Sequence, residues 1–307
     1  MHQSLARLKT KGAQKKLFII SFLAPAFLLY IAFFIYPAID AIRISFTDWT
    51  GFGTKAVFNG LDNYSKMLGD EVFWTSLGNS FIFMICGGII VFLLALVFAY
   101  LLTNYIVHQK FYLNIFYFPN LISFAALTIL WVFIFDGTFG VLNSILKSLG
   151  LEQYAVAWLG SRKTGMAAIT ATGAWFYLGF YLILIYSGIT KIPNSLFEAA
   201  ITEGASRPKI FFKVTFPLIW EILMIAVALW MINSLKLFEI VWGMTKGGPS
   251  MQTHVMGTYI YFNAFGTYQV FTFRLGYAST LAVALVLIIT IAVTVFRRIT
   301  TRETYEY

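Results

Sequence analysis

The chain has 307 residues, of which 59% are hydrophobic, 19% aromatic and only 11% charged. A water-soluble protein of this size does not bury so much apolar surface, because charged residues normally cover its outside. The composition therefore excludes an ordinary soluble domain and indicates a protein solvated mainly by lipid. The net charge of +9 does not indicate a nucleic-acid partner, since the basic residues flank apolar segments instead of gathering on one face.

The N-terminal segment combines a basic tail with a long apolar run. Residues 1–16 carry five Lys or Arg and no acidic residue, and Leu17–Ile39 is apolar. A cleaved signal peptide is the competing interpretation, favoured by Ala24-Pro25-Ala26, but the apolar run is longer than a signal core should be. We expect a retained transmembrane helix with a basic cytoplasmic flank.

Five further runs reach the roughly 20 apolar residues that a helix needs to cross a bilayer. Their Leu, Ile, Phe and Val residues each favour insertion by roughly 0.3–0.6 kcal/mol. With the first run they predict an all-α integral membrane protein of six transmembrane helices, with both termini on the same side. The five runs are Phe81–Thr103, Phe111–Phe135, Gly165–Ile189, Pro217–Lys236 and Gly276–Val295.

The distribution of basic residues predicts the orientation of these helices. The predicted inner segments hold thirteen Lys and Arg, whereas the longer outer segments hold the other nine of 22. Positive charge accumulates in cytoplasmic loops, so we expect both termini and the loop between the fourth and fifth helices in the cytoplasm. The expected organisation is a tail at 1–16, one transmembrane domain at 17–298 containing the 190–217 loop, and a second tail at 299–307.

The stretch from Ser195 to Leu218 is a polar interruption with a specific local pattern. Ser195 and Glu198 have the spacing of a capping box, and Gly204 stands where a left-handed C-terminal cap would end the helix. Ser206 is placed to cap a second short helix that has Pro208 in its first positions. A helix of about eight residues is not stable alone, so we expect it to rest on another surface. An ordinary connecting loop is the alternative.

Motifs for nucleotide binding, hydrolysis or metal binding do not occur in the sequence. It has no GxxxxGK[ST] loop, no G-x-S-x-G and no HExxH. His2, His108 and His254 are scattered without metal-ligand spacing, and Cys86 is the only cysteine. We therefore expect no enzymatic activity, metal or cofactor on this chain; a partner would have to bind any ATP that is used.

Motifs in order along the chain resemble the membrane subunits of binding-protein-dependent ABC importers. Glu198-Ala199-Ala200 followed by Gly204 resembles their EAA signature, although Glu203 stands where Asp is usual before the glycine. The similarity to the MalF-type sugar permeases is more specific and runs from about residue 17 to 298. Its other segments are 58–64, 118–119, Trp131, 158–159, Trp175, 192–193, Pro217, 235–239, 245–249 and 276–279.

The resemblance implies a permease subunit that forms, with a second related permease, the path for a sugar or oligosaccharide. An external binding protein would deliver the solute, and two cytoplasmic ATPase subunits would carry ATP and magnesium. The protein would lie in the inner membrane of a prokaryotic cell, and the 190–217 loop would be a coupling helix resting on an ATPase. Glu198 would cap its own helix, pair with a basic residue of the ATPase, or do both. The coupling residues that the resemblance implies are Glu198, Ala199, Ala200, Glu203, Gly204 and Ser206.

The same alignment implies a solute pathway. It assigns Tyr181 on the fourth helix and Trp230, Asn233, Ser234 and Leu237 on the fifth. Asn233 and Ser234 can hydrogen-bond hydroxyl groups, and the two aromatic residues offer flat faces to a sugar ring. Because Trp230, Asn233 and Leu237 are spaced i, i+3 and i+7, one helix face could present all three. Packing between helices is the alternative role for each residue.

Two other classes of protein compete with this interpretation. A secondary transporter driven by an ion gradient needs ionisable residues in the middle of the membrane, and the centres of the six runs have almost none. A membrane enzyme acting on lipid would need clustered Asp, Glu or His at a membrane face. Glu198 and Glu203 are the nearest approach to such a pair, but a separation of five residues points them to different faces of a helix.

Overall fold

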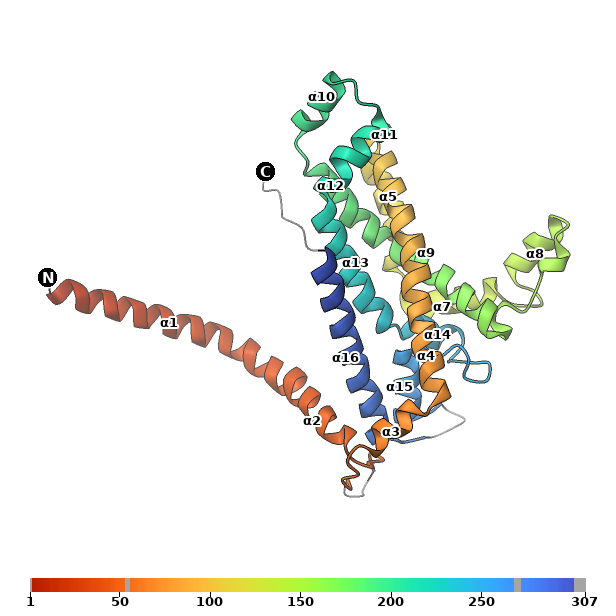
Figure 1. Cartoon of the computed structure of the whole chain (residues 1–307), viewed down its shortest axis with the longest axis horizontal. Helices are drawn as coiled ribbons and strands as arrows, with labels where there is room; N and C mark the ends of the chain where they lie inside the picture. Colours follow the sequence, from red (N-terminus) through yellow and green to blue (C-terminus); the bar gives the residue numbers. More distant parts are fainter. Residues whose placement is uncertain (1, 53–55, 268–271, 301–307) are drawn as a thin grey trace.

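The computed structural model describes residues 2–52, 56–267 and 272–300, whose regular secondary structure is helical with no β-strand among them. Long helices run between two ends of a bundle, one carrying α10 and the other α3 (Figure 1). The helices of the first half are α1 (His2–Tyr30), α2 (Tyr36–Ser45), α3 (Asp62–Leu68), α4 (Glu71–Ile82), α5 (Gly88–Tyr105), α6 (Gln109–Tyr117), α7 (Phe124–Ile134) and α8 (Val141–Ser148). Those of the second half are α9 (Arg162–Thr190), α10 (Asn194–Thr202), α11 (Arg207–Ile210), α12 (Phe216–Leu218), α13 (Trp220–Leu235), α14 (Glu239–Met244), α15 (Met256–Phe265) and α16 (Leu275–Thr300).

Four unbroken helical segments are long and apolar enough to cross a membrane. They are Lys15–Ser45, Glu71–Tyr105, Arg162–Thr190 and Leu275–Thr300. Each contains one of the runs predicted from the sequence. The number of candidate spans rises to six when each of two bent helix pairs is counted as one span.

The bent pairs correspond to the third and fifth runs predicted from the sequence. The third is broken between Gln109–Leu121 and Phe124–Ile134 with an angle of 94°, and the fifth between Arg207–Leu218 and Trp220–Leu235 with 68°. Pro119 and Pro217 each stand one helical turn or less before the break. Proline lacks the backbone N–H that the helical ladder requires, so the chain changes direction nearby.

The centre of the bundle is the contact between α5 and α9. Ala95 and Ala99 of α5 are fully buried, as are Ile169 and Ile185 of α9. Small residues allow helix backbones to approach closely where lipid gives little drive for association. α9 is thereby the most enclosed candidate span, with 67% of its apolar window buried.

The first candidate span leaves the body of the bundle. None of the apolar window in Lys15–Ser45 is buried, and Figure 1 shows α1 projecting away from the other helices. Only its end is fixed: the backbone oxygen of Ser45 accepts hydrogen bonds from Thr280 Oγ1 and Asn63 Nδ2, both at 3.0 Å. The span therefore behaves as an arm anchored beside α16 and α3.

A carboxylate joins three helices at the α3 end of the bundle. Asp70 Oδ1 caps α4 by accepting from the amide of Val72 at 2.9 Å. Its Oδ2 accepts from the hydroxyls of Tyr259 and Tyr277, each at 2.5 Å. These bonds hold α15, a helix that the sequence did not predict, against α4 and α16.

Candidate functional site

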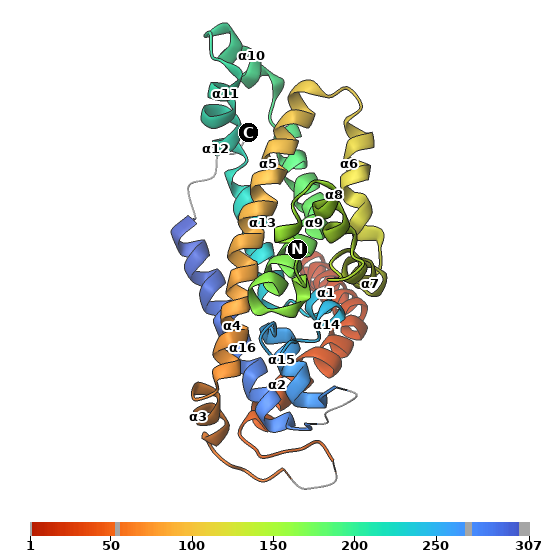
Figure 2. The same ribbon diagram turned by 90° about the vertical axis from the view of Figure 1, so that its right-hand side faces the viewer.

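α10 stands at the opposite end of the bundle from α3, at the top of Figures 1 and 2. None of its nine residues is buried. Glu198 and Ala199 are exposed, and Ala200 is half-buried. A helix this short gains little stability by itself, so it presents an open surface that another molecule would stabilise.

The start of α10 differs from the predicted capping box. The helix begins at Asn194, and Pro193 occupies the N-cap with no side-chain hydrogen bond. Because the backbone turn at Pro193 already starts the helix, Ser195 lies inside its first turn, where its hydroxyl no longer serves as the cap. The prediction that Glu198 caps its own helix was therefore wrong. Within the described residues the Glu198 carboxylate forms neither a hydrogen bond nor an ion pair.

The end of α10 confirms the glycine cap. Gly204 has φ of +74°, and its amide donates to Ile201 O at 2.9 Å while the amide of Ala205 donates to Ala200 O at 3.0 Å. This pair of bonds closes the last turn of a helix that ends in a left-handed residue. A Cβ at Gly204 would meet nothing within 4 Å. The left-handed backbone conformation therefore favours glycine here, and close packing does not require it.

The helix after the glycine is longer than predicted. Ser206 is its N-cap residue, although the serine side chain makes no capping hydrogen bond. α11 continues through a π-helical turn, Phe211–Thr215, into α12. The structure thus groups Glu198, Ala199, Ala200, Glu203 and Gly204 on α10 and its C-cap, with Ser206 across the turn.

Trp230 is enclosed by other aromatic side chains inside the bundle. It is 2% exposed, and its Nε1 donates to Met84 O at 2.7 Å. A π-helical turn at Phe83–Gly87 interrupts the regular hydrogen-bond ladder there, as such turns do. The indole lies over two glycines: a Cβ built on Gly88 would be 2.7 Å from Trp230 Nε1.

Tyr181 packs beside Trp230 with ring centroids 5.6 Å apart. Its hydroxyl and that of Ser234 are buried and have no hydrogen-bond partner within the described part of the chain. Asn233 is exposed, and its side chain lies near the Tyr181 hydroxyl. The Asn233 amide and the Tyr181 hydroxyl do not reach hydrogen-bonding geometry. The structure therefore brings the Tyr181 hydroxyl of α9 close to Asn233 of α13, and the Ser234 hydroxyl is buried at the next position of α13.

The predicted common helix face does not form. α13 ends at Leu235, so Leu237 lies in the connection to α14 and is itself buried. Trp230 and Leu237 are both enclosed, whereas Asn233 is exposed. An i, i+7 spacing requires a helix that continues through both positions, and this one stops too early.

Sequence reasoning did not single out the aromatic residues that enclose Trp230. The ring centroid of Trp230 lies 5.5 Å from that of Phe83, 6.5 Å from Phe92 and 5.7 Å from Tyr177. The one local signal was the i, i+4 spacing of Tyr177 and Tyr181, which places both on one face of α9. The other partners come from a different helix.

The helical bundle, its candidate spans and the projecting α10 define a multi-pass membrane protein. Residues 106–304 match the family described as the binding-protein-dependent transport system inner membrane component. The chain belongs to this family, and it is a permease of the ABC-importer type.

Relatives agree with this assignment over most of the chain. A probable ABC transporter permease of Bacillus subtilis, YurN, is 31% identical over 286 residues, covering 92% of this chain and 96% of that protein. The diacetylchitobiose uptake system permease NgcF of Streptomyces coelicolor is 30% identical over 279 residues, covering 87% and 78%. Both relatives are permeases, YurN of a probable ABC transporter and NgcF of a sugar uptake system. An ion-gradient-driven secondary transporter is correspondingly not favoured.

A solved structure shares the fold. The crystal structure of a bacterial alginate ABC transporter, in complex with an alginate pentasaccharide-bound periplasmic protein, contains a chain with a TM-score of 0.81 and 20% identity. The match covers 96% of this chain and 99% of the other. At this level of identity the comparison establishes the arrangement of the helices.

Proposed function

We propose that this permease moves a sugar or oligosaccharide across the inner membrane in an importer driven by partner ATPases. The observation that carries the proposal is α10, an exposed helix with the EAA-like residues at one end of the bundle. The named solutes of relatives support the substrate class: diacetylchitobiose for NgcF and alginate for the structurally similar transporter.

α10 is the proposed docking element for a cytoplasmic ATPase. Ala199 is small and exposed, which permits close approach of another surface, and Gly204 makes the turn that returns the chain to the bundle. Glu198 has no partner within the described chain, so its carboxylate is available to a basic residue of the ATPase. ATP and magnesium would be held entirely by two such ATPases, whose closure would move the helix bundles as rigid bodies.

The N-terminal arm supports pairing with a second permease. Lys15–Ser45 is a 31-residue segment that projects from the bundle and buries none of its apolar window. Helices in a membrane associate through packing with neighbouring helices. The apolar surface of this arm is available for such packing. A second, related permease would cover part of it and would supply the other half of the path.

The solute path is proposed at the contact of α9 and α13. Tyr181 of α9 and Ser234 of α13 keep their hydroxyls buried with no partner among the described residues, an arrangement that costs about 1–3 kcal/mol for each group. Movement of α13 away from α9 would open these hydroxyls to a polyhydroxylated solute beside Asn233. Trp230 and Leu237 are enclosed and would reach the solute only after such a movement. An external binding protein would deliver the solute.

The test is purification of the tagged chain in mild detergent from its own host, followed by mass spectrometry of the proteins that accompany it. We expect an ATPase and a second permease. Ala199→Arg should remove the ATPase while keeping the second permease, because the substitution obstructs the face of α10. Leu68→Arg, at an exposed position of α3 at the other end of the bundle, adds the same charge and should keep both partners.

Two results would contradict the proposal. Recovery of the chain alone, stable without partners, would bring back the secondary transporter. Retention of the ATPase by Ala199→Arg at the level of the unsubstituted chain would remove α10 from the docking surface.

A further inference from the structure

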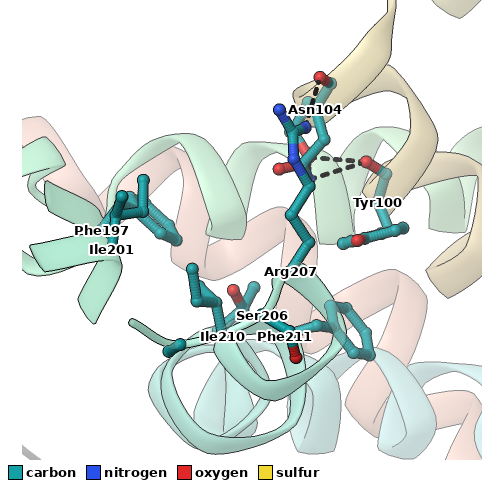
Figure 3. Close-up of a pocket in the computed structure, with 11 residues that line it drawn as sticks. Tyr100, Asn104, Phe197, Ile201, Ser206, Arg207, Ile210 and Phe211 are labelled. Atoms are coloured by element: carbon teal, nitrogen blue, oxygen red, sulfur yellow. Dashed lines mark hydrogen bonds between the residues drawn. The ribbon is translucent and has the colours of Figure 1, made fainter. Parts of the chain in front are cut away.

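A cavity of about 560 Å³ lies behind α10, between that helix, α11 and the end of α5 (Figure 3). Its volume lies within the range of small-molecule sites. Phe197 and Ile201 border it from α10, and Ile210 and Phe211 border it from the following helix. These four side chains give the cavity an apolar side.

Arg207 also lines the cavity and brings a cation to it. Arg207 Nη1 donates to the backbone oxygen of Asn104 at 3.1 Å, and the guanidinium carbon lies 4.9 Å from the ring centre of Tyr105. Within the described residues no carboxylate pairs with it or lines the cavity. A guanidinium has five N–H donors in a fork that matches phosphate oxygens, and one hydrogen bond leaves most of them available.

The position of the cavity relates it to the membrane surface. Tyr105 is the last residue of the candidate span Glu71–Tyr105, and Arg207 is the first residue of the bent pair that begins Arg207–Leu218. The guanidinium therefore stands where two spans meet the polar headgroup layer, while the aliphatic and aromatic lining extends along α10 and α11. Basic pockets between membrane helices on the cytoplasmic side are a recognised setting for anionic lipid headgroups.

We propose that this cavity binds an anionic phospholipid, with its phosphate on Arg207 and its apolar part against Phe197, Ile201 and Phe211. An amphiphile satisfies the cation and the apolar lining at once, whereas a free inorganic anion would leave the apolar lining unused. The binding itself does not depend on what α10 docks against. Its consequence, that a bound lipid braces α10 against the end of α5, does rest on the proposed coupling function.

The experiment measures which lipid the chain retains. The purified chain, with whatever subunits accompany it, is placed in nanodiscs of mixed phosphatidylglycerol and phosphatidylcholine, and the lipids released with it are weighed by native mass spectrometry. We expect preferential retention of phosphatidylglycerol, and a loss of that preference by about tenfold in Arg207→Ala, since a charge-assisted hydrogen bond is removed. Lys209→Ala, an exposed neighbour outside the lining, removes the same charge and should leave the preference unchanged.

A second variant tests the cavity without touching the charge. Ala205 lines the cavity, so Ala205→Leu should fill it and lower phosphatidylglycerol retention while Arg207 remains. This variant also keeps the proposal falsifiable if Arg207→Ala unfolds. Undiminished retention by Ala205→Leu or by folded Arg207→Ala would overturn the proposal, as would equal losses in Arg207→Ala and Lys209→Ala.

Two further measurements separate related explanations. Displacement of the lipid by inorganic phosphate would assign the site to a soluble anion and overturn the lipid proposal. Comparison of particles with and without the ATPase separates the site from coupling: the same lipid preference in both would support the site even if α10 proved not to be the docking element.

Discussion

At the residue scale, Gly204 combines a backbone requirement with an exposed position. Its φ of +74° is a conformation that costs other L-residues about 1–2 kcal/mol. Asn and Asp tolerate it better than most residues because their short side chains can hydrogen-bond locally. Gly204→Asp and Gly204→Asn therefore keep similar backbones and differ mainly in charge.

We expect Gly204→Asp to abolish solute uptake while the protein stays in the membrane, because a negative charge enters the surface next to Glu198 and Glu203. Gly204→Asn should retain most of the uptake. The measurement is uptake of radiolabelled sugar in cells, with membrane abundance of each variant followed by immunoblot. Normal uptake by Gly204→Asp would refute the role of this turn in coupling.

Gly88 is constrained by the indole of Trp230. A Cβ at this position would stand 2.7 Å from Trp230 Nε1, and Trp230 is held in place by its bond to Met84 O. We expect Gly88→Ala to lower stability by about 1–3 kcal/mol, the usual cost of overpacking a filled core. The midpoint of thermal unfolding in detergent, followed by tryptophan fluorescence, measures this loss.

Gly69 provides the control for that substitution. A Cβ there would be 3.7 Å from Lys66 O, an ordinary van der Waals distance, and the φ of Gly69 is −88°. Gly69→Ala should leave the midpoint close to that of the unsubstituted protein. Equal midpoints for Gly88→Ala and Gly69→Ala would show that the contact between Trp230 and Gly88 relaxes without cost.

Asn233 is the exposed polar residue of the proposed solute path. Asn233→Leu should reduce uptake by about three- to tenfold or change the preference among sugars, since one hydrogen bond contributes about 0.5–1.5 kcal/mol. The ATPase should remain bound, because Asn233 lies on α13 and not on α10. Asn114→Leu on α6, another exposed amide, is the matched control. Identical uptake kinetics for several sugars in both variants would exclude Asn233 from the path.

At the element scale, the lengths of the apolar runs predicted where the membrane helices lie but not where they bend. A run of apolar residues reports that a segment lies in lipid, but the bends near Pro119 and Pro217 depend on how the interrupted backbone packs against neighbours. α14 and α15 were not predicted because they are too short to cross a membrane. α15 is fixed by the distant Asp70, which local sequence does not reveal.

The candidate site was likewise predictable only in part. The glycine cap at Gly204 was predictable because its hydrogen bonds are made within a few residues. The start of α10 misled the prediction, since Ser195 and Glu198 match a capping box but Pro193 begins the helix earlier. The surroundings of Trp230 come from the π-helical turn Phe83–Gly87, from α5 and from α9, so only the folded chain shows that it is enclosed.

The segment before α15 carries a buried histidine. Burial lowers the pKa of His254 from 6.5 to about 4. Its Nδ1 lies 3.0 Å from Thr258 Oγ1, and its ring packs near Tyr259 and Phe262. The folded protein therefore keeps this imidazole neutral over a pH range in which the unfolded chain binds a proton.

Stability should consequently fall as the pH is lowered from about 6.5 to 4, because the unfolded state takes up the proton and the folded state does not. The full effect is about 3 kcal/mol, at 1.36 kcal/mol for each pKa unit. We expect the difference in unfolding midpoint between the unsubstituted protein and His254→Gln to change over this interval and to stay constant above it. Carboxylates titrate in both proteins and cancel in that difference. A constant difference from pH 7 to 4 would contradict the assignment.

At the scale of the whole molecule, the two ends of the bundle have different constructions. The α3 end is cross-linked by side chains, with Asp70 bonded to Tyr259 and Tyr277. At the α10 end, Trp220 Nε1 binds Thr300 O at 3.0 Å, while α10 itself buries no residue. A rigid end and an end with an exposed helix suit a permease in which one side receives force from partner subunits.

This asymmetry gives the orientation a direct test. The excess of basic residues predicts that the α10 end is cytoplasmic, and the loop containing Gly247 lies on the other side of the fifth span. Alkaline phosphatase, which is active only outside the cytoplasm, should be inactive when fused after Thr190 and active when fused after Gly247. Green fluorescent protein at the same positions should give the complementary pattern, which controls for fusions that fail to accumulate. Because docking of α10 requires contact with a cytoplasmic ATPase, the reverse pattern would overturn the coupling proposal. It would also move the lipid site to the opposite membrane surface, where the nanodisc measurement would still test it.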